Sequence, residues 1–221
     1  MFAKGKTPTS WLITLLVPLA LVLSVVRLLL TPLFIQLEYH MPYFPADPYG
    51  FSLEERLYWS ELSRQYLLND EDITFLSNLR FEDGSPVFNE RELRHMEDVK
   101  VILKRTMTVL VGAWLVLTVR LYLATRHGWL KEYRQAVSRG GWLTVGVIGA
   151  IVAFSILSFN TFFIKFHRLF FEGDTWLFAY SDTLIRLFPE RFWMDTFLVV
   201  GVLSLIGGCL LGWLFRQRQR I

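Results

Sequence analysis

Two histidines stand in sequence contexts that suit proton transfer. His95 lies in the stretch RHMEDVK with Asp98 three residues further along, and His167 lies in FHRLFF with Asp174 seven residues further along. On a helix, both separations place the imidazole and the carboxylate on the same side. An imidazole has an unperturbed pKa of about 6.5, so it can take up and release a proton near neutral pH. The pair predicts a general acid–base site with His95 and His167 as its catalytic residues.

Other kinds of site have weaker support in the sequence. It contains no G-x-S-x-G elbow, no P-loop and no HExxH motif, and its single cysteine, Cys209, lies in an apolar segment where it is expected to pack as a small apolar residue. Imidazole and carboxylate are ordinary zinc or iron ligands, so a metal site built from His95, Asp98, His167 and Asp174 is an alternative. The prediction adopted is a site without metal or cofactor.

The elements that must position these histidines belong to a membrane protein. Of the 221 residues, 53% are hydrophobic and 16% aromatic, while only 19% are charged. A helix needs about 20 mostly apolar residues to cross the hydrocarbon core. Segments that meet this requirement predict four transmembrane helices, at about residues 9–33, 104–124, 141–164 and 196–215. We expect an all-α integral membrane protein with a single domain over residues 1–221.

Charge in the short segments indicates the orientation. Basic residues gather on one side of the four apolar segments, as Lys4, Lys6, Arg126, Lys131, Arg134, Arg139, Arg216, Arg218 and Arg220. Because basic residues resist translocation, this side is expected to be cytoplasmic and to hold both termini. The insertion 34–103 and the loop 165–195 are then extracytoplasmic, together with both histidines. Basic residues that lie beside membrane segments do not indicate a nucleic-acid partner.

The insertion between the first two membrane segments is expected to be helical. SLEE at 52–55 and NERE at 89–92 are capping-box patterns, which start helices. Leu53, Leu57, Leu62 and Tyr66 fit one face of the first helix, and residues 71–79 suggest a second, short one. The helix that starts after residue 89 is expected to continue into the second membrane segment. The third membrane segment is expected to continue, as a helix, to His167.

Four stretches resemble one known family. RHMEDVK at 94–100, FHRLFF at 166–171, GDTWLFAYSDTLIRLFP at 173–189 and DPYGFSLEE at 47–55 are similar to the small four-segment bacterial membrane proteins that include the lipoprotein intramolecular transacylase, with its HMxDVK and FHxxFF motifs. The resemblance implies a bacterial cell-membrane enzyme that moves the sn-2 acyl chain of a diacylglyceryl-modified N-terminal cysteine onto the α-amine of the same cysteine. The histidines that match the family are His95 and His167.

The resemblance also implies roles for residues around the histidines. One histidine would act as general base and the other as general acid, and Asp98 and Asp174 would orient their rings. Acyl chains at the membrane surface would contact aromatic side chains, among them Phe163, Phe170 and Trp176. Candidate donors to a developing oxyanion are Lys100, Arg168 and Arg186. Asp182 and Arg186 are four residues apart, which predicts a helical ion pair.

Two alternative functions remain open at this point. One is a non-enzymatic membrane accessory protein that docks a partner through the Leu53, Leu57 and Leu62 face. The other is a metal-dependent membrane hydrolase that uses the four-residue site named above. For the transacylase, the expected partners are the diacylglyceryl-modified lipoprotein substrate and membrane lipid.

Overall fold

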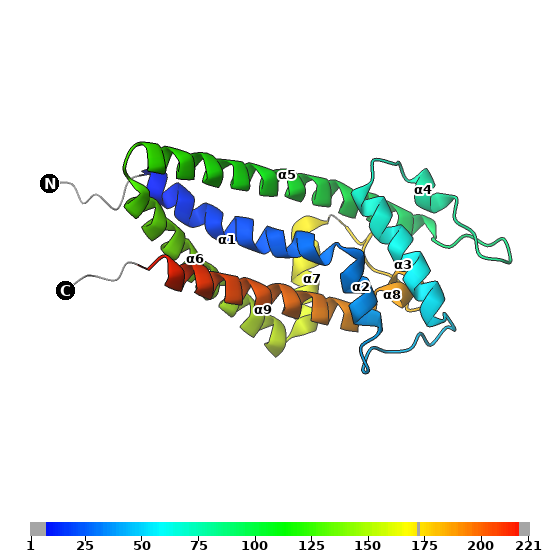
Figure 1. Cartoon of the computed structure of the whole chain (residues 1–221). Coiled ribbons are helices and arrows are strands. Elements are labelled where there is room, and N and C mark those ends of the chain that lie inside the picture. Colours follow the sequence, from blue (N-terminus) through cyan, green and yellow to red (C-terminus); the bar gives the residue numbers. More distant parts are fainter. Residues whose placement is uncertain (1–7, 172, 217–221) are drawn as a thin grey trace. The chain divides into compact units, whose positions relative to one another are not determined.

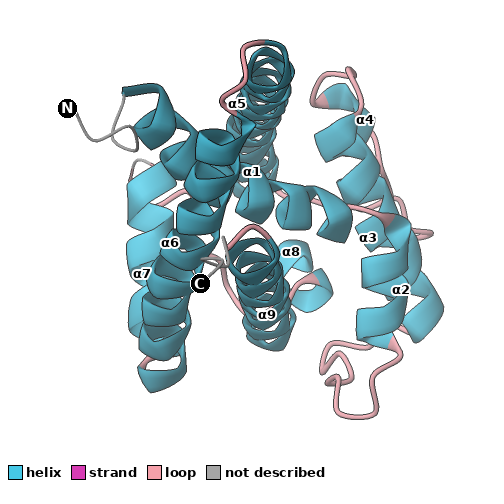
Figure 2. Cartoon of the chain, turned by 60° about the vertical axis from the view of Figure 1, so that its left-hand side comes forward, coloured by secondary structure: helices cyan, strands magenta, loops and turns pink. Residues whose placement is uncertain are grey.

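The computed structural model describes residues 8–171 and 173–216, and every regular element within them is a helix. Figure 2 shows these helices joined by loops. In chain order they are α1 (Pro8–Leu29), α2 (Pro32–Tyr39), α3 (Leu53–Leu68), α4 (Thr74–Ser77), α5 (Glu90–Arg126), α6 (Leu130–Leu157), α7 (Phe159–Phe170), α8 (Thr183–Leu187) and α9 (Glu190–Leu214). The predicted all-α class is confirmed.

Four of these helices, α1, α5, α6 and α9, are long and apolar enough to cross a membrane. They correspond to the four predicted segments. α1 ends at Leu29 rather than near residue 33, because Pro32 starts a new helix after a short turn. α5 continues from its capped start through the second segment as expected. Its first part, residues 90–105, is dense in charged side chains, so the apolar stretch able to span a membrane follows it.

The third segment differs from the prediction. We expected one helix to reach His167, but α6 ends at Leu157 and a separate helix, α7, begins at Phe159. Ser158 between them has φ −157° and ψ 82°, which is not a helical conformation. Its hydroxyl donates to Thr161 Oγ1 at 2.8 Å, and its carbonyl accepts from the Phe162 N–H at 3.0 Å. Ser158 is therefore the N-cap residue of α7, although its side chain accepts no backbone N–H of the helix.

The chain divides into two compact units. Unit 1 consists of Met1–Leu28, Thr106–Leu157 and Phe197–Ile221, and unit 2 consists of Leu29–Arg105 and Ser158–Thr196. Unit 2 therefore gathers nearly all of the two stretches expected to be extracytoplasmic, 34–103 and 165–195. The expectation of one membrane domain over the whole chain stays a prediction.

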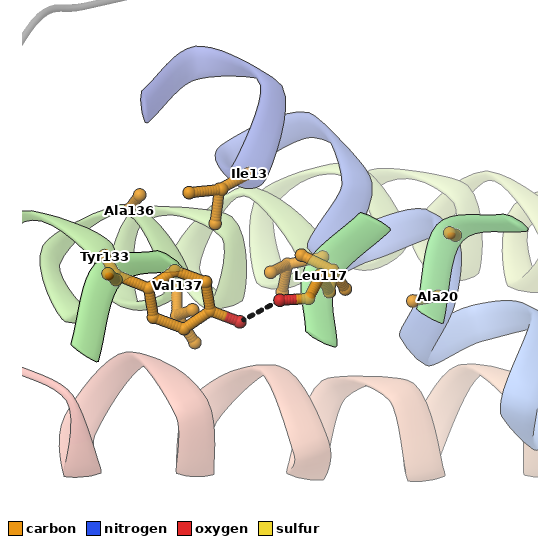
Figure 3. Packing of buried hydrophobic residues seen from close by; sticks show 9 residues of the cluster. Ile13, Ala20, Leu117, Tyr133, Ala136 and Val137 are labelled. Carbon is orange, nitrogen blue, oxygen red and sulfur yellow. Dashed lines mark hydrogen bonds between the residues drawn. The ribbon is translucent and has the colours of Figure 1, made fainter. Parts of the chain in front are cut away.

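Unit 1 contains most of the length of the four long helices, which run side by side (Figure 1). Its buried core includes Ile13 and Ala20 of α1, Leu117 of α5 and Tyr133 of α6 (Figure 3). The Tyr133 hydroxyl donates to the Leu117 carbonyl at 3.1 Å, which satisfies its polar end within the apolar core.

Unit 2 is organised around α8. Leu184 and Leu187 of this short helix are buried in one cluster with Tyr66 of α3 and Met96 of α5. The Tyr39 hydroxyl, at the end of α2, donates to the Leu187 carbonyl. Elements that are distant in the sequence are thus tied to one short helix, and one of these elements, α5, carries His95.

Of the four residues predicted to share one face of α3, only Tyr66 is buried. The capping box at Ser52 is present as expected. The buried residues of the helix are Arg56, Ser60, Ser63 and Tyr66. Leu53 is exposed, so the apolar face proposed for docking is not a single buried or exposed surface. Ser60 Oγ bonds the Tyr39 hydroxyl at 2.5 Å, and the Arg56 guanidinium lies 4.9 Å from the Tyr39 ring centroid. These partners allow polar side chains to be buried where the pattern indicated leucines.

The second short helix of the insertion is shorter than the predicted 71–79. It comprises only Thr74–Ser77. Asp72 Oδ1 accepts the Thr74 N–H at 2.8 Å, so a turn occupies the residues before the helix.

Candidate active site

Two elements of unit 2 that are far apart in the chain bring the histidine rings together. His95 lies on the charged first part of α5, and His167 lies in the last turn of α7. Their ring centroids are 6.3 Å apart, and the ring planes differ by 24°. His167 is the buried residue of α7, with 8% of its surface exposed. The two rings therefore lie within reach of one bound molecule.

Aromatic side chains enclose the His95 ring. The Phe171 ring centroid is 4.9 Å from that of His95, and the Phe178 centroid is 5.3 Å away. Phe171 also lies 5.6 Å from His167, so it borders both imidazoles. These contacts make the surroundings of His95 apolar.

A second group of aromatic side chains surrounds His167. The ring centroids of Phe163 and Trp176 lie 4.1 and 4.9 Å from that of His167. Trp176 is buried, and its indole N–H donates to the Gly173 carbonyl at 3.1 Å, which fixes the ring. Phe170 contacts Phe166 at 4.9 Å and is 45% exposed, so it lies at the outer side of this group.

One hydrogen bond determines the neutral tautomer of His167. Its Nδ1 lies 2.9 Å from the carbonyl oxygen of Phe163, one turn earlier on α7. A carbonyl can only accept, so Nδ1 must carry the hydrogen, and Nε2 of the neutral ring then holds the free lone pair. In His95, Nδ1 is buried and has no hydrogen-bond partner among residues 8–171 and 173–216. The two rings thus differ in how they are held.

Both imidazoles are shifted toward the neutral form. Burial, with the nearby His167 as a second cause, lowers the pKa of His95 to about 4. Burial also lowers the pKa of His167, although its bond to the Phe163 carbonyl opposes the shift. Burial disfavours the charged form of a base because an imidazolium in an apolar site loses its hydration. At neutral pH each histidine is therefore free to accept a proton.

The two carboxylates expected to orient the rings do not do so. Asp98 and Asp174 are exposed, and within the described residues neither accepts a hydrogen bond from a histidine. The helical spacing of His95 and Asp98 is real, but Asp98 extends to solvent. Asp174 follows the end of α7 in a turn, so the seven-residue spacing from His167 does not apply. The backbone carbonyl of Phe163 takes the orienting role instead.

Lys100, which was expected to be an oxyanion donor, binds other groups instead. Its ammonium donates to Asn69 Oδ1 at 2.9 Å and to the Glu71 carbonyl at 2.5 Å, and it lies 3.9 Å from the centre of the Tyr66 ring. These contacts lie at the C-terminal end of α3, where Asn69 is the cap residue. The expected oxyanion donor is therefore a structural cation.

Arg186 pairs with a residue that its helical spacing did not indicate. Its guanidinium contacts Asp47 Oδ2 at 2.9 Å and lies 3.4 Å from the centre of the Phe51 ring. Asp182, the expected partner, accepts from Asn89 Nδ2 at 3.2 Å and from the Ala179 N–H at 2.9 Å. Asp182 precedes α8 in extended backbone, so its side chain does not follow the helix. The predicted ion pair is replaced by a link between α8 and the 47–51 segment.

The remaining predicted cation, Arg168, follows His167 on α7 and is exposed. Adjacent helix residues do not face the same direction, so a shared face with His167 is not expected. Its role in binding an oxyanion stays a prediction.

Three residues near the site were not predicted as part of it. Phe171 and Phe178 contact the His95 ring, and Glu92 lies buried one turn before it. Both phenylalanines occur in the two motifs quoted for the site, so motif membership was an available signal for them. For Glu92 the sequence showed only a capping-box pattern, and the glutamate side chain of such a box is usually exposed.

The metal alternative requires several donor side chains that lie close together. Among the described residues, no group of three or more His, Cys, Asp or Glu side chains is arranged to hold a metal ion. Asp98 and Asp174, two of the four ligands considered, are exposed and are not bonded to the rings.

Fold and site together define an all-helical membrane protein with a buried and a partly buried histidine in an aromatic enclosure. The family model of the lipoprotein intramolecular transacylase Lit matches residues 10–193. The chain belongs to this family.

Relatives and solved structures agree with this assignment. A protein of Aquifex aeolicus (strain VF5), described as uncharacterized, is 30% identical over 187 residues, which are 83% of this chain and 82% of the relative. The structure of the membrane integral lipoprotein intramolecular transacylase Lit from Bacillus cereus is 21% identical, with a TM-score of 0.60 over 93% of this chain and 94% of that chain. A structure of the same protein with one histidine replaced by alanine gives a TM-score of 0.52, at 93% and 91% coverage. These structures share the fold of this chain.

Proposed function

We propose that this protein is an intramolecular lipoprotein transacylase. It would move the sn-2 acyl chain from the diacylglyceryl group of an N-terminal cysteine to the α-amine of the same cysteine, leaving a lyso-form lipoprotein. The observation that carries the proposal is the pair of neutral histidine rings, 6.3 Å apart, in a chain of this family. The substrate is anchored in lipid, so membrane lipid is the second partner.

The reaction needs a base more than it needs an enzyme nucleophile. An α-amine has a pKa of about 7.7–8.0, so near neutral pH most of it is protonated and unable to attack an ester. The attacking amine and the ester belong to one molecule. Holding the two in an attack geometry can lower the barrier by roughly 7–11 kcal/mol. An enclosure that fixes the substrate beside a base is therefore sufficient.

We assign His167 as the base, and its tautomer supports this assignment. With Nδ1–H bonded to the Phe163 carbonyl, Nε2 presents its lone pair and takes the proton of the attacking amine. The new bond joins the amine nitrogen to the acyl carbon, and the bond that breaks joins that carbon to the glycerol oxygen. The proton lost by nitrogen is the one that oxygen needs to leave as an alcohol.

His95 is assigned to the departing oxygen. Its ring lies 6.3 Å from that of His167 and stays neutral because burial depresses its pKa to about 4. A neutral imidazole has one N–H to donate to an oxygen, and the proton held by the His167 imidazolium can pass to that oxygen across it. The enclosing rings of Phe171, Phe178 and Trp176 exclude water from the reacting groups.

Replacing either histidine tests the proposal. We expect His95→Ala and His167→Ala each to lower lyso-form product by about 10²-fold or more, because a positioned acid or base contributes about that much. The measurement is mass spectrometry of lipoprotein N-termini from cells that express each variant. His40→Ala is the matched control, since His40 is exposed at the end of α2 and its ring bonds the Gln36 carbonyl of that helix. Wild-type product levels in a folded histidine variant would remove that residue from the mechanism.

The same proposal includes an orientation. Both termini would be cytoplasmic, and His95 and His167 would face the extracytoplasmic side. The supporting observation is the basic segment that joins α5 and α6, with Arg126, Lys131 and Arg134, against the more acidic stretches of unit 2. Lys4, Lys6, Arg218 and Arg220, which also entered the prediction, lie outside the described residues.

A further inference from the structure

Glu92 is a buried carboxylate near the histidines that the proposed chemistry does not use. It lies three residues before His95 on α5 and exposes 1% of its surface. One oxygen accepts the N–H of Asn89 at 2.8 Å, and the other accepts the N–H of Leu184 in α8 at 2.6 Å. The first bond belongs to an ordinary helix cap. The second reaches 92 residues along the chain.

Three further bonds join the start of α5 to the segment that Glu92 reaches. Arg91 Nη1 donates to the Leu177 carbonyl at 3.1 Å, and Asn89 Nδ2 donates to Asp182 Oδ1 at 3.2 Å. Thr183 Oγ1 donates to the carbonyl of Val87, just before the helix, at 2.5 Å. Residues 177–184 are therefore fastened to the helix that carries His95, with Glu92 as the buried member of the set.

Two of the aromatic residues that enclose the histidines lie at or just before the start of residues 177–184. Phe178 is 5.3 Å from the His95 ring and Trp176 is 4.9 Å from the His167 ring. Phe178 belongs to residues 177–184, and Trp176 directly precedes them, so a shift of this segment along α5 would displace Phe178 and pull on Trp176. The distance between the histidine rings and their aromatic cover thus depends on the bonds at the start of α5.

Burying this carboxylate is costly, which argues that it has a role beyond helix capping. Burial raises the pKa of Glu92 to about 7, although the N–H groups of Leu184 and Asn89 lower it. The glutamate of a capping box normally sits at the surface, as Glu55 does at the start of α3. A capping role alone would not require removal from solvent.

We propose that Glu92 is a positioning residue of the histidine site. By accepting one N–H from the start of α5 and one from α8, it holds the segment with Trp176 and Phe178 against the rings of His167 and His95. This assignment rests on the proposed function for its effect on turnover, while its effect on the enclosure of His95 is independent of any activity.

Glu92→Gln is the first test. A carboxamide offers one acceptor oxygen and an NH₂ group, so one of the two N–H groups is left facing a donor. We expect the turnover number per folded molecule to fall about tenfold with the substrate concentration at half-maximal rate unchanged, since binding surfaces remain. Removal of one buried hydrogen bond to a charged group is worth about this factor. Glu90→Gln is the control, because Glu90 is exposed in the same first turn and the charge change is identical.

A second readout separates positioning from general stability. Diethyl pyrocarbonate modifies accessible imidazoles, and its rate at His95 can be followed by peptide mass spectrometry. In Glu92→Gln we expect this rate to rise several-fold, at a temperature well below the melting transition, while the rate at exposed His40 stays as in the wild type. A purely structural carboxylate would lower the melting temperature and leave the protection of His95 unchanged.

Arg91→Met covers the case in which Glu92→Gln does not fold. Arg91 is exposed, so the variant loses the bond to the Leu177 carbonyl without opening the interior. It should raise the modification rate of His95 by a smaller factor, about twofold. Wild-type protection of His95 in both variants, or in the folded one of the two, overturns the proposal. Absence of lyso-form product from the wild type would overturn the proposed function and leave the protection test valid.

Discussion

At the level of single residues, the site depends on keeping two imidazoles neutral and differently bonded. His167 has a fixed Nδ1–H and a free Nε2, while His95 has a buried Nδ1 without a partner among the described residues. Among residues 8–171 and 173–216, no carboxylate is bonded to either ring; such a partner would favour the imidazolium. A neutral ring offers a lone pair to the proton of an amine, and because the enclosure does not stabilise the cation, the ring readily releases that proton again.

The depressed pKa of His95 has a consequence for stability. Between its unfolded pKa of about 6.5 and its folded pKa of about 4, the unfolded chain binds a proton that the folded protein does not. The contribution of His95 to stability is therefore fully present above pH 6.5 and is lost as the pH falls toward 4. In His95→Gln, unfolding free energy in detergent should fall less steeply, by up to about 1.4 kcal/mol per pH unit. The two curves should run parallel from pH 7.5 to 8.5, and parallel curves from pH 6.5 to 4 would contradict the shift.

At the level of elements, close backbone contact holds α6 against α9 in unit 1. A Cβ on Gly141 of α6 would lie 2.6 Å from the Gly208 carbonyl oxygen and 2.6 Å from the Gly212 nitrogen of α9. Gly208 and Gly212 form a G-x-x-x-G pattern, the spacing at which membrane helices approach closely. Ser138 Oγ also donates to the Gly212 carbonyl at 2.8 Å. Small residues here permit a contact that any side chain would prevent.

Gly141→Ala should therefore destabilise the protein, by roughly 1–3 kcal/mol, because the added methyl group meets backbone that cannot rotate away. Gly149→Ala in the same helix is the control. A Cβ at Gly149 has no atom within 4 Å, so this variant should be unchanged or more stable by up to about 1 kcal/mol through helix propensity. Unfolding in detergent measures both. Equal stability of the two variants would show that the α6–α9 contact can widen without cost.

The elements also show which features could be predicted from the sequence. Span composition and the capping box at Ser52 depend on neighbouring residues, and both were predicted correctly. The break at Ser158 could not be read from hydropathy, since apolar residues continue on both sides of it. The partner of Arg186 is Asp47, 139 residues away, and no local spacing indicates such a pair. The aromatic enclosure was predicted only in part, because its members gather from α7 and a loop that folds back on α5.

At the level of the whole molecule, each unit combines segments that are distant in the chain. Unit 2 joins Leu29–Arg105 with Ser158–Thr196, so His95 and His167 reach one site only after both stretches have folded together. Besides apolar packing, hydrogen bonds of Glu92 and Tyr39 and an ion pair of Arg186 join its elements. Such a unit needs an aqueous surface for its many exposed charged residues, which fits a position outside the hydrocarbon core.

The orientation of the chain can be tested by cysteine labelling. Cys209 is exposed and is first replaced by alanine to give a background without cysteine. Into it are introduced Glu82→Cys in unit 2 and His127→Cys in the turn between α5 and α6, both at exposed positions. If the α5–α6 turn is cytoplasmic, as proposed from its basic residues, a membrane-impermeant maleimide should label the cysteine at position 82 in intact spheroplasts. The cysteine at position 127 should react only after the membrane is permeabilised. The reverse pattern would place both histidines on the cytoplasmic side, where a transacylase acting on exported lipoproteins would not meet its substrate, and it would contradict the orientation proposed for this protein.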